Sequence, residues 1–382
     1  MPLREPTSNR INSLDLVRGL VMVLMAIDHV RVYSGLPAGG PTAGIFFTRW
    51  VTHFCAPAFC FFAGTSAFLQ GRRLGAPALA RHLVARGLFL VLLEPTLIRF
   101  TWTFNVDVAS FLLAGVIWML GWCMVLLAGL VHLRTRTIAT IGLGIVLGQQ
   151  LFRFLPRLLP GTIRDSAGWI LGFVYPAGLS GPENVAVLYT IVPWIGVMAT
   201  GYAFGAVLVR DPEKRDKLCW RIGLAATALF LVVAGAKAIL SPPPDGPMPA
   251  LFVFLNPPKY PASQLFLLMT LGPTIAFLPF AERMQGPVAK ALTTFGRVPL
   301  FYYLLHIPVI HVAALVVSRV REGAVHAEWY ATAPYVSVPP EQRWSLPLLY
   351  LVFAIVIAIL YVACRWFAAV KARQPRGWLR FV

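Results

Sequence analysis

Charged side chains are scarce in this sequence. Only 13% of its 382 residues are Asp, Glu, Lys or Arg, whereas 58% are hydrophobic. A soluble globular protein carries about 25% charged and about 45–50% apolar residues. So little charge leaves too little polar surface to cover a soluble fold of this length. Apolar runs of about 20 residues recur along the chain, and this length crosses a bilayer as a helix. The sequence therefore predicts an all-α, polytopic integral membrane protein.

Other common signatures are absent. The five cysteines lie mostly inside apolar runs and form no paired framework, so neither disulfides nor a zinc site is predicted. The sequence contains no P-loop, no dinucleotide-binding fingerprint, no G-x-S-x-G elbow and no H-E-x-x-H motif. These absences predict no metal centre, and they exclude the enzyme classes that the motifs mark.

Apolar runs separated by charged breaks predict about ten spans in a single domain of residues 1–382. The approximate limits of the spans are 14–33, 51–70, 83–100, 108–131, 137–155, 186–209, 220–240, 262–281, 297–318 and 346–368. An even number of spans places both ends of the chain on the same side of the membrane.

Acidic residues are few: 15 Asp and Glu stand against 33 Lys and Arg, a formal net charge of +18. In a soluble protein this excess would suggest nucleic-acid binding. Here the basic residues gather in the even-numbered connections and in both tails, which by the positive-inside rule predicts cytoplasmic termini. The excess is therefore attributed to topology and to attraction by membrane lipids, and no nucleic-acid partner is expected. The odd-numbered connections are longer or richer in Gly and Pro, namely 34–50, 156–185, 241–261 and 319–345.

Several ionisable side chains fall inside the predicted spans at similar depth. They are His29, His53, Glu94, Arg99 and His306. A rise of 1.5 Å per residue places them between the membrane centre and its outer surface, with His53 nearest the surface. Ionisable residues are expensive there and by default mark a functional site. Structural alternatives stay open, because His29 and His53 could be interfacial residues that snorkel to water.

Glu94 is the residue least easily explained by structure alone. It lies within Leu92-Leu93-Glu94-Pro95, and Pro95 leaves a backbone carbonyl without its helical donor. A pair with Arg99 is an alternative, but the i,i+5 spacing is off the neighbouring positions of a helix. We therefore expect its partner on another span. Tyr302 lies one turn before His306 and is expected to line the same site.

A second set of residues gathers at the cytoplasmic ends of the spans. Arginine binds phosphate bidentately, so these residues predict a phosphate-binding edge. The set comprises Arg18, Arg72, Arg73 and Arg297. A structural alternative stays open here too, because Asp15 and Arg18 are i,i+3 neighbours and could simply pair. On the outer side, a proline-rich loop is expected to hold Lys259 and Tyr260 over the opening.

Four stretches resemble a bacterial membrane family related to the catalytic domain of heparan-α-glucosaminide N-acetyltransferase. The first is Ser13-Leu14-Asp15-Leu16-Val17-Arg18-Gly19 leading into Met25-Ala26-Ile27-Asp28-His29-Val30-Arg31. The others are Thr48-Arg49-Trp50-Val51-Thr52-His53-Phe54-Cys55-Ala56-Pro57, Lys259-Tyr260-Pro261 and Phe295-Gly296-Arg297-Val298-Pro299-Leu300-Phe301-Tyr302-Tyr303-Leu304-Leu305-His306. The resemblance implies a bacterial inner-membrane protein that moves an acetyl group from cytoplasmic acetyl-CoA to an amino sugar on the other side. The family's catalytic histidine follows the first span, but residues 34–50 of this chain contain no histidine.

The leading hypothesis is therefore a membrane-embedded acyltransferase that uses acetyl-CoA or another acyl-CoA as donor and an outward-facing sugar or glycan as acceptor. His29 is the expected general base, oriented by Asp28 or Glu94, with His306 opposite it. His53 is the rival base. The residues expected to bind the acceptor are His53, Arg99, Lys259, Tyr260 and Tyr302, and the arginine edge is expected to hold the donor.

Two other functions stay open at this point. One is a transporter or flippase for an anionic lipid or sugar that uses the same polar site, and the other is a scaffold without catalytic activity. The sequence also leaves open whether the protein is a monomer or a homodimer.

Overall fold

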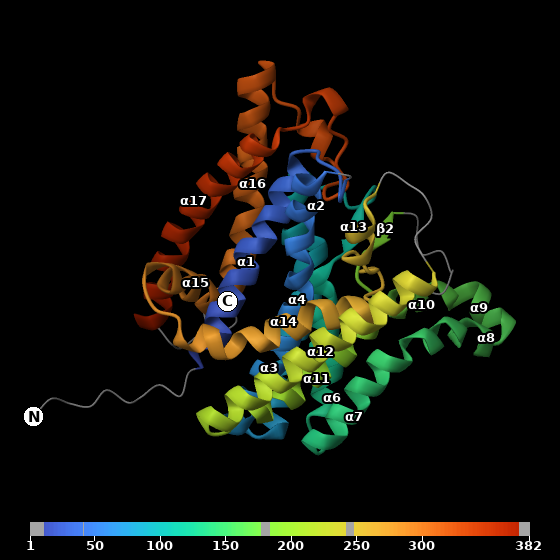
Figure 1. Cartoon of the computed structure of the whole chain (residues 1–382). Coiled ribbons are helices and arrows are strands. Elements are labelled where there is room, and N and C mark those ends of the chain that lie inside the picture. Colours follow the sequence, from blue (N-terminus) through green and yellow to red (C-terminus); the bar gives the residue numbers. More distant parts are fainter. Residues whose placement is uncertain (1–10, 41, 177–183, 242–247, 374–382) are drawn as a thin grey trace, which may run out of the picture.

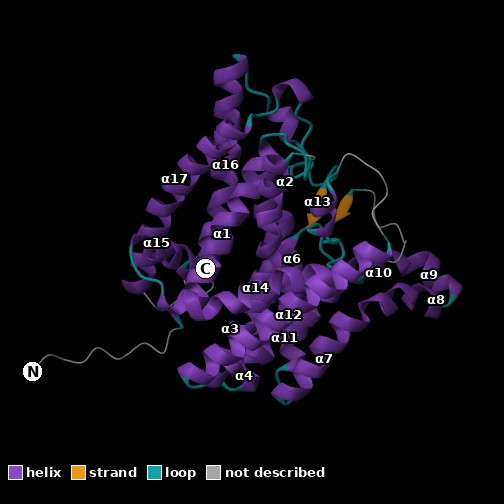
Figure 2. Ribbon diagram, in the orientation of Figure 1, coloured by secondary structure: helices purple, strands orange, loops and turns teal. Residues whose placement is uncertain are grey.

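The computed structural model describes residues 11–40, 42–176, 184–241 and 248–373. In these ranges most of the chain is helical, as the sequence predicts (Figure 1, Figure 2). One small parallel sheet is described, in which β1 (Leu112–Ala114) pairs with β2 (Val185–Val187). The basic tail residues Arg4, Arg10, Arg376 and Arg380 lie outside the described residues.

The helices vary from one turn to eight turns in length. The longer ones are α1 (Asn12–Tyr33), α3 (Cys55–Leu74), α4 (Ala76–Leu93), α6 (Val116–Leu130), α7 (Thr135–Gly148), α11 (Ile191–Leu208), α12 (Pro212–Leu240), α14 (Gln264–Arg283), α15 (Pro287–Arg297), α16 (Pro299–Glu322) and α17 (Leu346–Arg373). The short ones are α2 (Ala43–Trp50), α5 (Arg99–Thr103), α8 (Leu155–Leu158), α9 (Gly161–Ala167), α10 (Leu171–Val174) and α13 (Ala250–Phe254). Turns of 3₁₀ helix occupy Val51–Phe54, Gln149–Phe154, Gly168–Ile170, Ala327–Tyr330 and Pro340–Gln342, and one π-helical turn occupies Glu94–Ile98.

Seven helical segments in the described ranges are long and apolar enough to cross a membrane. They are Ala43–Leu74, Thr135–Leu158, Ile191–Leu208, Pro212–Leu240, Gln264–Arg283, Pro299–Glu322 and Leu346–Arg373. The other three predicted spans coincide with α1, α4 and α6, which are not among the seven. Helix α1 carries four charged residues, and α6 is only 15 residues long. The membrane-protein class thus agrees with the structure, whereas the count of ten stays a prediction.

The structure corrects three predicted boundaries. The predicted span 108–131 begins too early, because its first part contains β1 and the helix starts at Val116. The span 186–209 likewise begins in β2, and its helix starts at Ile191. An apolar run alone does not distinguish a buried strand from a helix. The predicted connection 34–50 contains α2, so the segment with His53 is helical well before residue 51.

Helix α1 occupies the centre of the arrangement. It packs against α3, α14, α15, α16 and α17, so side chains along its length reach several neighbours. Figure 1 shows α16 and α17 on one side of α1, and α11, α12 and α14 running obliquely on the other. Helices α7, α12 and α17 keep most of their surface exposed, as lipid-facing helices do. Functional side chains on α1 therefore lie in the interior.

Two glycines allow α1 and α15 to cross closely. A Cβ atom on Gly19 would overlap the backbone carbonyl of Leu292, and one on Gly296 would overlap the carbonyl of Asp15. Glycine alone therefore permits this crossing. The contact places Arg18 of α1 and Arg297 of α15 at the same end of the molecule. We call this the basic end, because Arg72, Arg73 and Arg210 border a cavity that Arg18 also lines.

Ten spans and basic even-numbered connections predict that Val382 faces the cytoplasm. A reporter that is active only in the periplasm should stay inactive when it is fused to Val382. The same reporter inserted within residues 319–345 should be active, which controls for expression. Activity of the C-terminal fusion would contradict a cytoplasmic C-terminus.

Candidate functional site

A large cavity opens at the basic end. It has a volume of about 1220 Å³ and is lined by α1, α3 and α11 together with the start of α12. We call it the vestibule. Its lining is dominated by arginine and includes Arg18, Arg72, Arg73, Arg210 and Arg215, against the carboxylates Asp15 and Glu282. Three of the four arginines predicted to form a phosphate-binding edge, Arg18, Arg72 and Arg73, thus border one cavity.

A second cavity of about 290 Å³, the inner cavity, continues from the vestibule, with which it shares four lining residues. The shared residues are Asp15, Arg18, Ser66 and Gln70. Arg18 Nη2 donates to the carbonyl of Phe62 at 3.0 Å and to the hydroxyl of Ser66. Asp15 Oδ1 lies 3.7 Å from Arg18 Nη1, so the i,i+3 pair considered from the sequence is present. Arg18 is therefore held in a fixed orientation at the junction of the two cavities.

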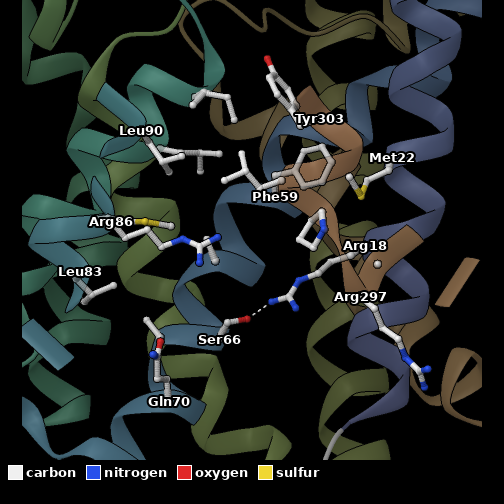
Figure 3. Close-up of a pocket in the computed structure, with 18 of the residues that line it drawn as sticks. Arg18, Met22, Phe59, Ser66, Gln70, Leu83, Arg86, Leu90, Arg297 and Tyr303 are labelled. Carbon is white, nitrogen blue, oxygen red and sulfur yellow. Dashed lines mark hydrogen bonds between the residues drawn. The ribbon is translucent and has the colours of Figure 1, made fainter. Parts of the chain in front are cut away.

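Arg86 reaches the inner cavity from the opposite wall. Figure 3 shows the Arg86 and Arg18 side chains entering from α4 and α1, with Ser66 of α3 between them. The Nε atom of Arg86 is buried and has no hydrogen-bond partner in the described part of the chain. Arg297 also lines this cavity, but it is exposed and extends away from Arg18 (Figure 3).

A third cavity of about 470 Å³, the outer cavity, lies beyond the inner one. Tyr303 and Val116 line both cavities, so the two meet at these residues. The ionisable residues of the outer lining are Asp28, His29, Arg31, Arg49, Glu94, Lys259, Tyr189, Tyr260, Tyr303 and Tyr335. Five of the residues predicted for the site, Asp28, His29, Glu94, Lys259 and Tyr260, are thus brought to one cavity from three separate segments.

His29 and His306 contact each other directly. His29 Nδ1 lies 2.7 Å from His306 Nε2, and the two rings stack with centroids 4.9 Å apart. His306 Nδ1 lies 2.6 Å from the carbonyl oxygen of Tyr303 and 3.2 Å from that of Tyr302. Carbonyl oxygens only accept, so His306 Nδ1 must carry the proton and Nε2 of the neutral ring is an acceptor.

This arrangement also assigns the tautomer of His29. Because His306 Nε2 accepts, His29 Nδ1 must donate, and the lone pair of neutral His29 then lies on Nε2. No residue in the described ranges hydrogen-bonds that Nε2 atom. The Trp102 ring packs against His29 in a T-shaped arrangement with centroids 4.8 Å apart and restrains the imidazole plane. His29 therefore has one oriented nitrogen and one nitrogen available to accept a proton.

Neither expected orienting carboxylate binds His29. Asp28 Oδ1 accepts from Arg31 Nε at 3.0 Å and lies 3.8 Å from Arg49 Nε. Glu94 Oε2 accepts from the backbone N–H of Trp118 at 2.8 Å, so this carboxylate caps the start of α6. Glu94 does find its partner on another segment, as expected, but the partner is a helix N-terminus and not a cation. The orienting neighbour of His29 is His306.

Three predicted residues lie away from the outer cavity. The guanidinium of Arg99 donates to backbone carbonyls of Asn105 and Phe111 and so closes the loop before β1. The Tyr302 hydroxyl donates to the Met22 carbonyl at 3.0 Å, inside the packing of α1 on α16. The structure brings neither residue into the lining of the outer cavity.

His53 is the third. Its Nε2 lies 3.1 Å from Asn256 Oδ1, and its Nδ1 lies 3.3 Å from Arg49 Nη1 and 3.3 Å from the Arg49 carbonyl. Both ring nitrogens thus have partners, and His53 is not in the lining of the outer cavity. This geometry leaves His53 without a nitrogen free to accept a proton from an acceptor molecule.

Lys259 occupies the border between the outer cavity and a neighbouring one of about 390 Å³. Its Nζ atom lies 5.1 Å from the ring centroid of Tyr260 and 5.8 Å from that of Tyr189. Lys259 is 9% exposed, and no carboxylate in the described ranges lies within ion-pair distance of it. The predicted loop therefore does present Lys259 and Tyr260 to the cavity, supported by cation–π contacts.

The sequence reasoning missed three residues that line these cavities. Arg86 lies inside the predicted span 83–100 and could have been identified as an intramembrane arginine. Arg49 lies one helical turn before His53, but it falls outside the predicted span 51–70, so the same criterion could not identify it. Tyr303 was missed because only Tyr302 was expected in the site. The two tyrosines point about 100° apart around the helix, and Tyr303 is the one that lines the inner and outer cavities. Within the described residues, no group of three or more His, Cys, Asp or Glu side chains is placed to hold a metal ion.

A family model described as "Heparan-alpha-glucosaminide N-acetyltransferase, catalytic" matches residues 10–241. This range includes Arg18, His29, Arg86 and Glu94, whereas His306 lies beyond it. No curated protein matches the chain. Because the match covers more than half of the sequence, the chain belongs to the heparan-alpha-glucosaminide N-acetyltransferase catalytic family, a family of membrane acyltransferases.

Proposed function

We propose that this protein transfers an acyl group from acyl-CoA, bound through the vestibule and the inner cavity, to an acceptor bound in the outer cavity. The observation that carries this proposal is the junction at Tyr303 and Val116, where a cavity lined by arginines meets a cavity lined by His29. Anionic donor and nucleophilic acceptor can thus approach the same point from different directions. The acyl donor and the acceptor are inferred from this chemistry and from the family.

The length of α1 matches the length of an acyl-CoA donor. Eleven residues separate Arg18 from His29, a rise of about 16 Å along the helix. The pantetheine arm of CoA places about a dozen bonds between its diphosphate and its thioester, which at roughly 3.5 Å per three extended bonds spans about 14 Å. A phosphate held near Arg18 therefore brings the thioester to the level of His29.

His29 supplies the base that the reaction requires. Its Nε2 takes a proton from the amine or hydroxyl of the acceptor as that group attacks the thioester carbonyl. When the tetrahedral intermediate collapses, the C–S bond breaks, the acyl group stays on the acceptor, and Nε2 returns the proton to the CoA thiolate. The hydroxyl of Tyr303 is a donor available at the junction for the oxyanion.

The charge of the outer cavity favours an acceptor with polar or anionic groups. Three cations, Arg31, Arg49 and Lys259, line it together with the carboxylates Asp28 and Glu94. Arg31 and Arg49 share Asp28, which leaves Lys259 without a carboxylate partner in the described ranges. We take a sugar amine or hydroxyl as the nucleophile. With the basic end facing the cytoplasm, the donor enters from inside and the acceptor from outside.

The test is whether purified protein binds acetyl-CoA saturably and releases free CoA thiol when glucosamine is added. Calorimetry measures the binding, and a thiol reagent measures the release. Saturable binding with acceptor-dependent release supports the transferase. Absence of saturable acetyl-CoA binding overturns it, and uptake of glucosamine into proteoliposomes without any thiol release favours the transporter that the sequence left open.

A further inference from the structure

Arg86 carries a charge that the described protein residues do not balance. Its Nε atom is buried without a hydrogen-bond partner, and no ion pair joins its guanidinium to a carboxylate in the described ranges. The only acidic residue in the lining of the inner cavity is Asp15, which lies 3.7 Å from Arg18. The guanidinium of Arg86 therefore faces the same cavity as that of Arg18, and no carboxylate in the described ranges pairs with it.

Such an arrangement is costly unless a ligand completes it. Removing a charged group from water is unfavourable when no partner replaces the lost hydration, and two cations in one cavity add mutual repulsion. An anion with several acceptor oxygens between the two guanidinium groups offsets both terms. Arginine on two walls matches the oxygens of a phosphate, which arginine binds bidentately. The Ser66 hydroxyl is not counted among the donors, because it already donates to the Phe62 carbonyl at 2.6 Å.

We propose that Arg18 and Arg86 bind the phosphate group at the end of the pantetheine arm from two sides, and that Arg86 makes the protein specific for phosphorylated pantetheine donors. This inference rests on the proposed function, because the distance from Arg18 to His29 along α1 is what identifies the phosphate in question. Arg18 is oriented by Asp15 and by the Phe62 carbonyl, so its guanidinium is held in a fixed position at the wall of the inner cavity. Arg86 Nε, in contrast, is buried and has no hydrogen-bond partner in the described ranges.

The position of the phosphate also determines where the nucleotide lies. The inner cavity shares Arg18, Ser66 and Gln70 with the vestibule, so a group attached to the phosphate on the side away from His29 enters the vestibule. There Arg72 and Arg73 line the wall. The adenosine and its 3′-phosphate are therefore expected to contact these two residues, which face the vestibule and not the inner cavity.

The experiment compares three probes that differ in phosphate content: pantetheine, 4′-phosphopantetheine and acetyl-CoA. Calorimetry on the purified full chain measures the affinity of each probe for the wild type and for Arg86→Gln. Losing charge-assisted hydrogen bonds should weaken 4′-phosphopantetheine and acetyl-CoA about 10- to 100-fold and leave pantetheine unchanged. Arg86→Lys should restore part of the loss, because lysine keeps the charge but lacks the planar fork.

Arg81→Gln is the matched control, because Arg81 lies on the same helix but is exposed. It should leave the affinity for all three probes unchanged. Equal weakening of pantetheine by Arg86→Gln would overturn the proposal, since the residue would then only shape the cavity. So would wild-type protein that binds 4′-phosphopantetheine no more tightly than pantetheine, a comparison that needs no variant to fold.

Three outcomes separate this proposal from others. Displacement of 4′-phosphopantetheine by short-chain phosphatidylglycerol at equal concentration would assign the phosphate site to a lipid headgroup and overturn the donor proposal. Wild-type protein that binds acetyl-CoA tightly but does not distinguish the two shorter probes would overturn the role of Arg86 and leave the acyltransferase standing. Failure to bind acetyl-CoA at all would instead overturn the proposed function.

Discussion

Replacing His29 by alanine should lower the rate of acyl transfer by about 10²–10⁴-fold, the contribution typical of a general base. The reason is geometric. Tyr303 and His306 fix the tautomer that leaves the lone pair on His29 Nε2, and no other described group takes that lone pair. Acetyl-CoA affinity should stay unchanged, because the arginines expected to hold the donor lie about 16 Å away along α1. The measurement is thiol release at saturating acetyl-CoA, paired with calorimetry.

His53→Ala is the matched control for that experiment. Both nitrogens of His53 are engaged by Arg49 and Asn256, so this variant should keep its rate within a few-fold of the wild type. Full activity of His29→Ala together with collapse of His53→Ala would move the base to His53. Full activity of both variants would end the histidine mechanism.

Composition and hydropathy were sufficient to predict the fold class. Charged residues are too few for a soluble surface, and apolar runs of membrane length recur, so a bundle of membrane helices follows from general physical rules. The helix starts were harder to predict. Residues 112–114 lie inside one predicted span and residues 185–187 lie at the start of another, yet these apolar segments pair with each other as strands. A pairing between segments so far apart along the chain leaves no local signal.

That boundary error also concealed the partner of Glu94. With a span assumed to begin at 108, no helix N-terminus was expected near Trp118. The structure starts α6 at Val116, where free N–H groups are available to a carboxylate, and Glu94 Oε2 accepts one of them. Gly115 allows this approach, because a Cβ atom there would lie 2.6 Å from Glu94 Oε1. The depth of Glu94 was predictable, whereas the identity of its partner was not.

Depth likewise placed His29 and His306 in one layer without showing that they touch. They are 277 positions apart in the sequence, and their contact depends on how α16 packs against α1. Residue spacing along a helix specifies which residues share a face, but it does not specify which helix faces which. The same limit applies to Arg18 and Arg86, which belong to different helices and meet only across the inner cavity.

The second large effect is expected at His306, which acts through His29 and is therefore a positioning residue. Its Nε2 accepts the proton of His29 Nδ1 and so keeps the other nitrogen of His29 free. His306→Leu fills a similar volume but accepts no hydrogen bond, so His29 can adopt the opposite tautomer. Loss of the group that holds a catalytic histidine in one tautomer lowers kcat by up to about 10⁴-fold, and we expect at least a 10²-fold loss here.

His306→Gln distinguishes this role from simple packing. The side chain of His306 is fully buried, so either replacement perturbs the same contacts with Tyr302 and Tyr303. Glutamine, however, offers a carbonyl oxygen that can accept from His29 Nδ1, and its rate should recover to within about tenfold of the wild type, since one neutral hydrogen bond replaces another. The measurement is kcat for both variants at matched thermal stability. If His306 controls the tautomer of His29, the Gln variant, which can accept the hydrogen bond, must be faster than the Leu variant. Equal rates for the two variants would show that His306 contributes only packing.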